Sequence, residues 1–152
     1  KPYQIMVIGR SLGGGVATDL VHRHPESAGL VLMSAFRSVS HAAEYRFRDK
    51  PYWTIVGRIK LMFMRTLARQ ILAGDEYDNL SKIKVIENPL YLIHGKFDDV
   101  ISYNESKELF RSSISKEKHI TLSVAGHEQG NFFMLLRFVD SNYGYWGGKV
   151  VL

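Results

Sequence analysis

The sequence predicts an α/β fold in three layers, in which helices cover both faces of a mainly parallel sheet. Short apolar runs occur at residues 3–8, 29–34 and 89–94, and they are continuous rather than alternating, as is typical of strands buried on both faces. Stretches with helical character separate these runs, and alternation of strands with helices favours a parallel sheet. A composition with 45% hydrophobic and 23% charged residues is ordinary for a globular domain.

The first run leads directly into a glycine-rich turn at residues 9–15 and then into a helix. The helix is predicted over residues 14–24. It ends before Pro25, because a proline disfavours helical geometry in the residue that precedes it. This part of the chain is therefore predicted to form a strand, a sharp turn and a helix.

The later elements follow in the same alternating order. After the runs at residues 29–34 and 89–94, we expect a helix at residues 102–112, a strand at residues 119–124 and a final helix at residues 128–139. The sequence thus predicts four strands with covering helices.

The connection between the second and third strands has about fifty residues, whereas the usual connection between a strand and a helix has about two to six. We therefore expect one domain over residues 1–152 that carries a helical insertion, a lid or cap, at residues 36–88. Arg58, Arg65 and Arg69 share one face of a helix predicted there. A packed helix with a solvated stripe explains this face, and a basic lid facing a membrane or an acyl substrate is the alternative.

Charge and cysteine content exclude several classes of function. The net charge is +5, but the cations are dispersed and no recognition motif accompanies them, so we expect no nucleic-acid partner. The chain has no cysteine, which excludes disulfides, thiolate zinc sites and a cysteine nucleophile. His22, His24 and Glu26 lie close together in sequence, but no further ligand pattern supports a metal site. We therefore expect neither a metal nor a cofactor.

Residues 9–13 read Gly-Arg-Ser-Leu-Gly, which matches the pattern Gly-x-Ser-x-Gly between a predicted strand and a predicted helix. In this pattern the serine occupies a strained turn that presents its hydroxyl, and the glycines let backbone segments pass closely. The motif predicts Ser11 as a nucleophile and the Leu12 N–H as a donor of an oxyanion hole. A phosphate-binding loop is the alternative, but it would require a Lys before a Ser or Thr at its end.

Candidates for an acid and a base follow two other predicted strands. His127 follows the last strand, so it is expected at the same edge of the sheet as Ser11 and is the predicted general base. Asp98 and Asp99 both follow the third strand, and from position alone either could orient the histidine. His94 ends that strand and is predicted to be structural.

Together these segments resemble the eukaryotic α/β-hydrolase domain-containing proteins, a group that includes membrane-associated serine hydrolases and protein depalmitoylases. The resemblance rests on the Gly-x-Ser-x-Gly motif at residues 9–13, here called the nucleophile elbow, on the segment Asn-Pro-Leu-Tyr-Leu-Ile-His-Gly at residues 88–95, on Asp98 and on Gly126-His127. It covers most of residues 3–140. It implies that Asp98 is the acid, because this residue lies three positions after the glycine of His-Gly.

The resemblance further implies a serine hydrolase that cleaves acyl esters or thioesters through an acyl-enzyme. The expected partners are a small acyl ester, a lipid or an acylated protein as substrate, together with a membrane surface. A non-catalytic hydrolase-like module that binds a lipid or a protein is the alternative.

Family members have four further strands before the elbow strand, and the loop that supplies a second oxyanion donor is among them. This sequence contains no such region and does not begin with Met, so we expect it to be the C-terminal part of the fold. Loss of one oxyanion donor lowers turnover by about 100- to 1,000-fold, so the isolated chain is expected to have weak or no activity. Its open sheet edge is expected to favour association. An upstream anchor would decide between cytoplasmic and membrane-associated localisation, which the sequence leaves open.

Overall fold

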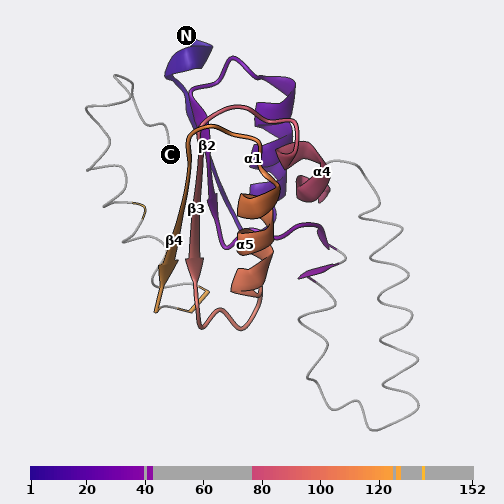
Figure 1. Ribbon diagram of the computed structural model, residues 1–152, viewed down its shortest axis with the longest axis vertical. Coiled ribbons are helices and arrows are strands. Elements are labelled where there is room, and N and C mark those ends of the chain that lie inside the picture. The colour runs from indigo at the N-terminus through magenta and orange to yellow at the C-terminus, as the bar shows by residue number, and fades with distance from the viewer. Residues whose placement is uncertain (40, 43–76, 125, 128–134, 136–152) are drawn as a thin grey trace, which may run out of the picture.

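The computed structural model describes residues 1–39, 41–42, 77–124, 126–127 and 135. These residues form one parallel four-stranded sheet of order β1-β2-β3-β4 (Figure 1). The strands are β1 (Met6–Arg10), β2 (Gly29–Met33), β3 (Leu90–Gly95) and β4 (Lys118–Ser123). Every neighbouring pair is parallel, which confirms the predicted α/β fold with a parallel sheet.

The described helices are α1 (Leu12–Arg23), α4 (Asn79–Ile83) and α5 (Tyr103–Ser112), and all of them lie on one side of the sheet in Figure 1. Helix α1 packs on β1 and β2, α5 packs on β3 and β4, and α4 contacts both of these helices. Between helices and sheet lies a core of buried residues: Ala17, Val21, Leu30, Leu32, Ala35, Ile83, Ile86, Leu90, Leu92 and Leu109.

The other face of the sheet is also buried. Alternate strand residues point to opposite faces, so Val31 and Met33 of β2 leave the helical side that Leu30 and Leu32 occupy. They cluster with Leu135, which has helical backbone geometry and is 4% exposed. Burial on both faces explains the continuous apolar runs. The rest of the final helix predicted at residues 128–139 lies outside the described residues.

The first strand differs from its prediction. Residues 3 and 4 belong to a 3₁₀ turn, η1 (Pro2–Gln4), and the strand runs from Met6 to Arg10. Proline holds φ near the helical value and is favoured in the first position of a helical turn, which explains the shift. Tyr3 and Ile5 are 61% and 45% exposed, so the prediction that this segment is buried on both faces was wrong.

The described elements α1, β2, β3, α5 and β4 begin and end within one or two residues of their predicted positions, whereas α4 lies inside the predicted insertion and had no predicted bounds of its own. Helix α1 begins at Leu12, two residues earlier than predicted, and ends at Arg23, before the His24-Pro25 step. Helix α5 begins after Ser102, whose hydroxyl accepts a hydrogen bond from the Asn104 N–H. Strand β4 shows alternating exposure, as is usual for a strand at the edge of a sheet.

Two segments of the predicted insertion, residues 36–37 and 79–80, are hydrogen-bonded to each other. The Asn79 side chain donates to the Phe36 carbonyl at 2.8 Å, and the Leu80 N–H donates to the Arg37 carbonyl at 3.0 Å. Arg37 also forms an ion pair with buried Glu105 of α5, with 2.7 Å between Nη2 and Oε1. The chain therefore leaves and rejoins the described core at one point beyond β2. Residues 43–76, where most of the insertion was predicted, lie outside the described residues.

Candidate active site

Ser11 occupies the turn between β1 and α1 with φ 51° and ψ −123°. A positive φ is rare for a residue other than glycine and marks a backbone held in a strained conformation by its surroundings. The Ser11 N–H donates to the Met33 carbonyl at 2.9 Å, which ties the turn to the end of β2. Ser11 is also the residue immediately before α1, so its hydroxyl lies at the positive end of that helix.

The two glycines of the motif have different surroundings. A Cβ on Gly9 would lie 2.5 Å from the Ala17 Cβ and 2.5 Å from the Gly13 carbonyl, because strand and helix cross closely there. A Cβ on Gly13 would meet no atom within 4 Å among the described residues. The close approach of backbone segments that the motif predicts is therefore located at Gly9.

Asp98 lies in the loop after β3, and its side chain is fully buried. Its Oδ1 accepts hydrogen bonds from the backbone N–H groups of Val100 and Ile101, at 2.9 and 2.8 Å. Burial raises the pKa of Asp98, but interactions with His94, two backbone N–H groups and His127 hold that pKa well below its usual value. The carboxylate therefore remains ionised at neutral pH.

His127 lies in the loop after β4, with its Nδ1 2.7 Å from Asp98 Oδ2 and its side chain 15% exposed. An ionised carboxylate only accepts, so Nδ1 carries the proton, and in the neutral imidazole Nε2 is then the basic nitrogen. The His127 carbonyl accepts a hydrogen bond from the Arg10 guanidinium at 3.0 Å. Because Arg10 immediately precedes Ser11, this bond links the loop that contains His127 to the turn that contains Ser11.

The structure distinguishes the two aspartates that position alone left open. Asp98 is 3% exposed and contacts His127, whereas Asp99 is exposed on the outside of the same loop. Although the two aspartates are adjacent in sequence, Asp98 is buried and Asp99 faces solvent.

His94 has contacts that the sequence analysis missed. It is completely buried at the end of β3, with its Nε2 3.0 Å from the Ile101 carbonyl and 3.3 Å from Asp98 Oδ2. Its Nδ1 lies 2.6 Å from the Ser106 hydroxyl of α5. The spacing of four residues between His94 and Asp98 across a tight loop was the available signal. Arg10 was also missed, and only its position beside Ser11 pointed to it.

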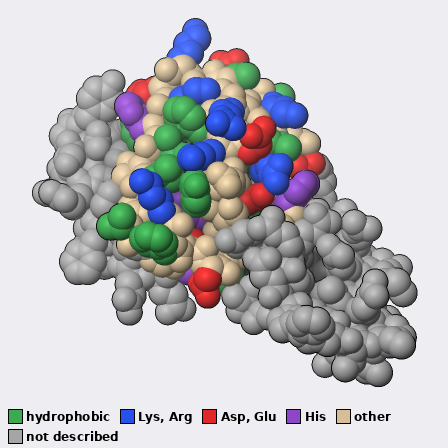
Figure 2. All heavy atoms as spheres, turned by 60° about the horizontal axis from the view of Figure 1, so that its bottom comes forward, with side chains coloured by type: hydrophobic (Ala, Val, Ile, Leu, Met, Phe, Trp, Pro, Cys, Tyr) green, Lys and Arg blue, Asp and Glu red, His purple; other side chains and the backbone are tan. Residues whose placement is uncertain are grey.

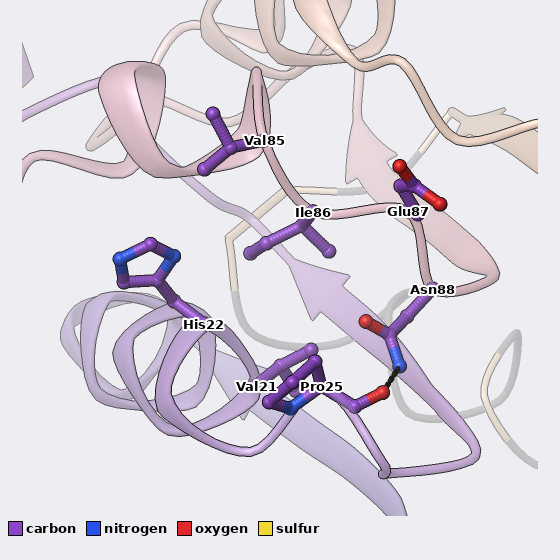
Figure 3. Close-up of a pocket in the computed structure, with 7 residues that line it drawn as sticks. All are labelled: Val21, His22, Pro25, Val85, Ile86, Glu87 and Asn88. Carbon is purple, nitrogen blue, oxygen red and sulfur yellow. Dashed lines mark hydrogen bonds between the residues drawn. The ribbon is translucent and has the colours of Figure 1, made fainter.

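Other features lie apart from this site. Within the described ranges, no group of three or more His, Asp or Glu residues is arranged to hold a metal ion, and no helix has the length and apolarity to span a membrane. A hollow of about 470 Å³ is lined by His22, Glu87 and Asn88 among others, with Asn88 bonded to the Pro25 carbonyl (Figure 3). It lies beyond the C-terminal end of α1 and before β3, whereas Ser11, Asp98 and His127 follow the carboxyl ends of strands. Figure 2 shows Lys and Arg side chains dispersed among other residue types over the visible face.

The chain is similar in sequence to several curated proteins, although no protein-family model matches it. Alpha/beta hydrolase domain-containing protein 17B of Homo sapiens is 26% identical over 127 residues, which cover 84% of this chain and 36% of that protein. A putative alpha/beta hydrolase of Acanthamoeba polyphaga mimivirus is 25% identical, over 83% of this chain and 40% of that protein. Lysophosphatidylserine lipase ABHD12 of Xenopus tropicalis is 29% identical, over 70% of this chain and 28% of that protein. The chain thus spans two fifths or less of the length of these relatives.

Solved structures give the same result for the fold. The Pyrococcus furiosus esterase Pf2001 superposes with a TM-score of 0.65 at 20% identity, over 94% of this chain and 53% of that one. The esterase domain of a Rhodothermus marinus protein superposes with a TM-score of 0.60 at 17% identity, over 93% of this chain and 58% of that one. The chain therefore has the α/β-hydrolase fold, and its sequence is similar to those of α/β-hydrolase domain-containing proteins.

Proposed function

We propose that the protein is a serine hydrolase that cleaves acyl esters or thioesters, with Ser11 as nucleophile, His127 as general base and Asp98 as acid. The observation that carries this proposal is the 2.7 Å contact between the fully buried Asp98 carboxylate and His127 Nδ1. A second link, from Arg10 to the His127 carbonyl, joins the histidine to the strained turn that holds Ser11. Relatives named alpha/beta hydrolases, and one named a lipase, support the same reaction class.

In the proposed reaction the Ser11 hydroxyl attacks the acyl carbon while His127 Nε2 takes its proton. Asp98 stabilises the resulting imidazolium, because its carboxylate is ionised and accepts the Nδ1–H. The imidazolium then returns the proton to the departing alkoxide or thiolate, which leaves an acyl-enzyme. A water molecule, deprotonated by the same nitrogen, releases the carboxylic acid and restores Ser11.

Negative charge on the acyl oxygen needs hydrogen-bond donors in both steps. The Leu12 N–H belongs to the first turn of α1, where backbone N–H groups have no partner within the helix. The positive end of the helix dipole adds to this stabilisation. We propose Leu12 as one donor of the oxyanion hole.

The proposed substrates are small acyl esters, lipids or acylated proteins. One relative is named a lysophosphatidylserine lipase, and a lipid ester is therefore a first compound to assay. We also propose that the protein acts at a membrane surface, and that in the isolated chain the edge of the described sheet at β1 favours association.

A fluorophosphonate probe tests the nucleophile directly, because it forms a stable adduct with an activated serine. We expect labelling of the full-length protein at Ser11 and loss of labelling in Ser11→Ala. Ser27→Ala is the matched control: Ser27 lies before β2 at the other end of the sheet, and its buried hydroxyl has no hydrogen-bond partner in the described part of the chain. If correctly folded wild-type protein is not labelled, the module is a binding domain and the proposal is wrong.

A panel of short- and long-chain acyl esters, acyl thioesters and peptides then separates substrate classes. The same three side chains perform acyl transfer on all of them, so only turnover can distinguish these classes. We expect esters or thioesters to be turned over faster than peptides. A preference for peptides would contradict the proposed substrate class but not the nucleophile.

A further inference from the structure

A second histidine reaches the carboxylate that we propose as the acid. His94 is completely buried between β3 and α5, and its Nε2 lies 3.3 Å from Oδ2 of Asp98, the same oxygen that His127 Nδ1 approaches to 2.7 Å. The other carboxylate oxygen accepts two backbone N–H groups. An ionised carboxylate has about four acceptor positions, and four nitrogens that carry hydrogen lie within 3.3 Å of this one. The fourth of them, His94 Nε2, shares its hydrogen with the Ile101 carbonyl.

The surroundings of His94 determine which of its nitrogens carries a proton. The two groups nearest Nε2 are the Ile101 carbonyl and the Asp98 carboxylate, and both only accept. Nε2 must therefore be the N–H. The Ser106 hydroxyl, 2.6 Å from Nδ1, is both a donor and an acceptor and satisfies the remaining nitrogen.

Ile101 links these interactions into one unit. Its N–H donates to Asp98 Oδ1 at 2.8 Å, and its carbonyl accepts from His94 Nε2 at 3.0 Å. His94 therefore bonds to the backbone of the loop that contains Asp98 and also contacts the Asp98 carboxylate itself. Ser106 belongs to α5, so its contact with His94 Nδ1 joins this arrangement to that helix.

We propose that His94 is a positioning residue for catalysis: with Ser106 fixing its protonated nitrogen, it holds the Asp98 carboxylate so that Oδ2 meets His127 Nδ1. This inference rests on the proposed function of Asp98 and His127. A carboxylate with an unfilled acceptor position can rotate or admit water, and His127 then loses its orientation. Because the effect passes through Asp98 and His127, it lowers turnover without changing contact with the substrate.

Two substitutions at residue 94 separate this role from simple core packing. In His94→Gln the side-chain amide nitrogen is three bonds from Cβ, as Nε2 is, so it can still donate to Ile101 and Asp98. In His94→Asn the amide nitrogen is only two bonds from Cβ, as Nδ1 is, and it cannot reach them. We expect His94→Asn to lower kcat by about 10- to 100-fold with KM unchanged, since a small misplacement remote from the reacting atoms can cost about 100-fold. We expect His94→Gln to restore most of the loss.

Proton NMR gives a readout that needs no turnover. A His127 Nδ1–H held against a buried carboxylate gives a strongly downfield resonance, assigned by its loss in His127→Gln. We expect this resonance in wild-type protein and in His94→Gln, and its loss or upfield shift in His94→Asn. Ser106→Ala removes the partner of Nδ1 without touching Asp98, and we expect a smaller effect in the same direction. It also replaces His94→Asn if that variant does not fold.

The control for loss of a buried polar group is Asn79→Ala, because Asn79 is as buried as His94 and its side chain bonds to the Phe36 carbonyl, away from the acid. We expect it to lower Tm while kcat and the His127 resonance stay as in wild type. If His94→Asn lowers Tm but leaves kcat and the resonance unchanged, His94 is only structural and the inference is wrong. If wild-type protein has no hydrolase activity, the proposed function fails, and the resonance still decides whether His94 orients the Asp98 and His127 pair.

Discussion

Replacing Asp98 with asparagine is the sharpest test of the proposed acid, because the structure dictates how the amide must lie. Two backbone N–H groups point at Oδ1, at 2.9 and 2.8 Å. In Asp98→Asn the amide oxygen must occupy this position, and the amide NH₂ then occupies the position of Oδ2. A donor would thus face His127 Nδ1 and His94 Nε2, both of which carry protons in the wild type.

The consequence for His127 follows from hydrogen-bond chemistry. To accept from the amide, its Nδ1 must lose its proton, and the neutral ring then carries the proton on Nε2. Nε2 can no longer remove a proton from Ser11. In the well-studied serine protease triad the same substitution lowers kcat by about 10,000-fold with the geometry intact, and we expect a loss of about that size here. The amide also faces the His94 N–H, which we expect to cost about 1–3 kcal/mol of stability.

The assay is steady-state hydrolysis of an activated acyl ester by the full-length protein, with Tm measured on the same preparations. Asp99→Asn is the matched control, because it makes the same chemical change at an exposed neighbouring residue, and we expect wild-type activity from it. The reasoning is refuted if folded Asp98→Asn keeps activity within about tenfold of wild type, or if Asp99→Asn is the more damaging change.

Three further predictions concern stability, each measured as the free energy of unfolding in urea. Gly9→Ala should destabilise by about 1–3 kcal/mol, because its Cβ would lie 2.5 Å from the Ala17 Cβ. Gly13→Ala should stabilise by about 0.5–1 kcal/mol, because Gly13 lies in α1 and a Cβ there meets no described atom within 4 Å. Equal effects of the two substitutions would contradict the close approach at Gly9. Folding lowers the pKa of Asp98 from its ordinary value of 3.8. Its contribution to the free energy of unfolding is therefore complete above pH 3.8 and is lost as the pH falls toward the lowered pKa. Asp98→Asn should lack this part of the acid dependence of stability. Asp19→Ala should destabilise more than Lys82→Met. In Asp19→Ala the buried Lys82 ammonium loses its partner at 2.7 Å, whereas in Lys82→Met the Asp19 carboxylate keeps Arg23 at 2.8 Å. The reverse order would contradict this account.

The sequence predicted the two central strands, β2 and β3, well because each has a strong local signal. In β2 and β3 every residue is buried, so the apolar runs mark these strands to within one residue. In β1 only Met6 and Gly9 are buried, so burial constrains its sequence less, and the preceding Pro2 favours a helical turn that hydrophobicity alone does not reveal. The error at residues 3–5 therefore has a local physical cause.

The candidate site was less accessible to sequence reasoning, because its important contacts join residues that are distant in the chain. Asp98 and Asp99 carry the same side chain in one loop, and only tertiary burial separates them. Arg10 bonds to a residue 117 positions away, so no local pattern contains that contact. His94 looked structural because a buried histidine at a strand end is usually satisfied by its neighbours, and its contact with Asp98 depends on how the intervening loop folds back.

The register of the sheet, rather than any single loop, fixes the distances on which the proposed mechanism depends. Arg10 pairs with Met33, Met33 pairs with Ile93, and Gly95 pairs with Ser123, so the elbow, the acid loop and the histidine loop all begin at matched positions on neighbouring strands. A slip of two residues preserves the buried face of a strand but moves its end by about 6.6 Å. Such a slip at β4 would break the 2.7 Å contact between His127 and Asp98 as well as the Arg10 bond to the His127 carbonyl. Side chains that fix the register, such as the stacked rings of Tyr91 and His119 at 5.2 Å on β3 and β4, therefore contribute to the geometry of the candidate site although they lie far from Ser11 in sequence.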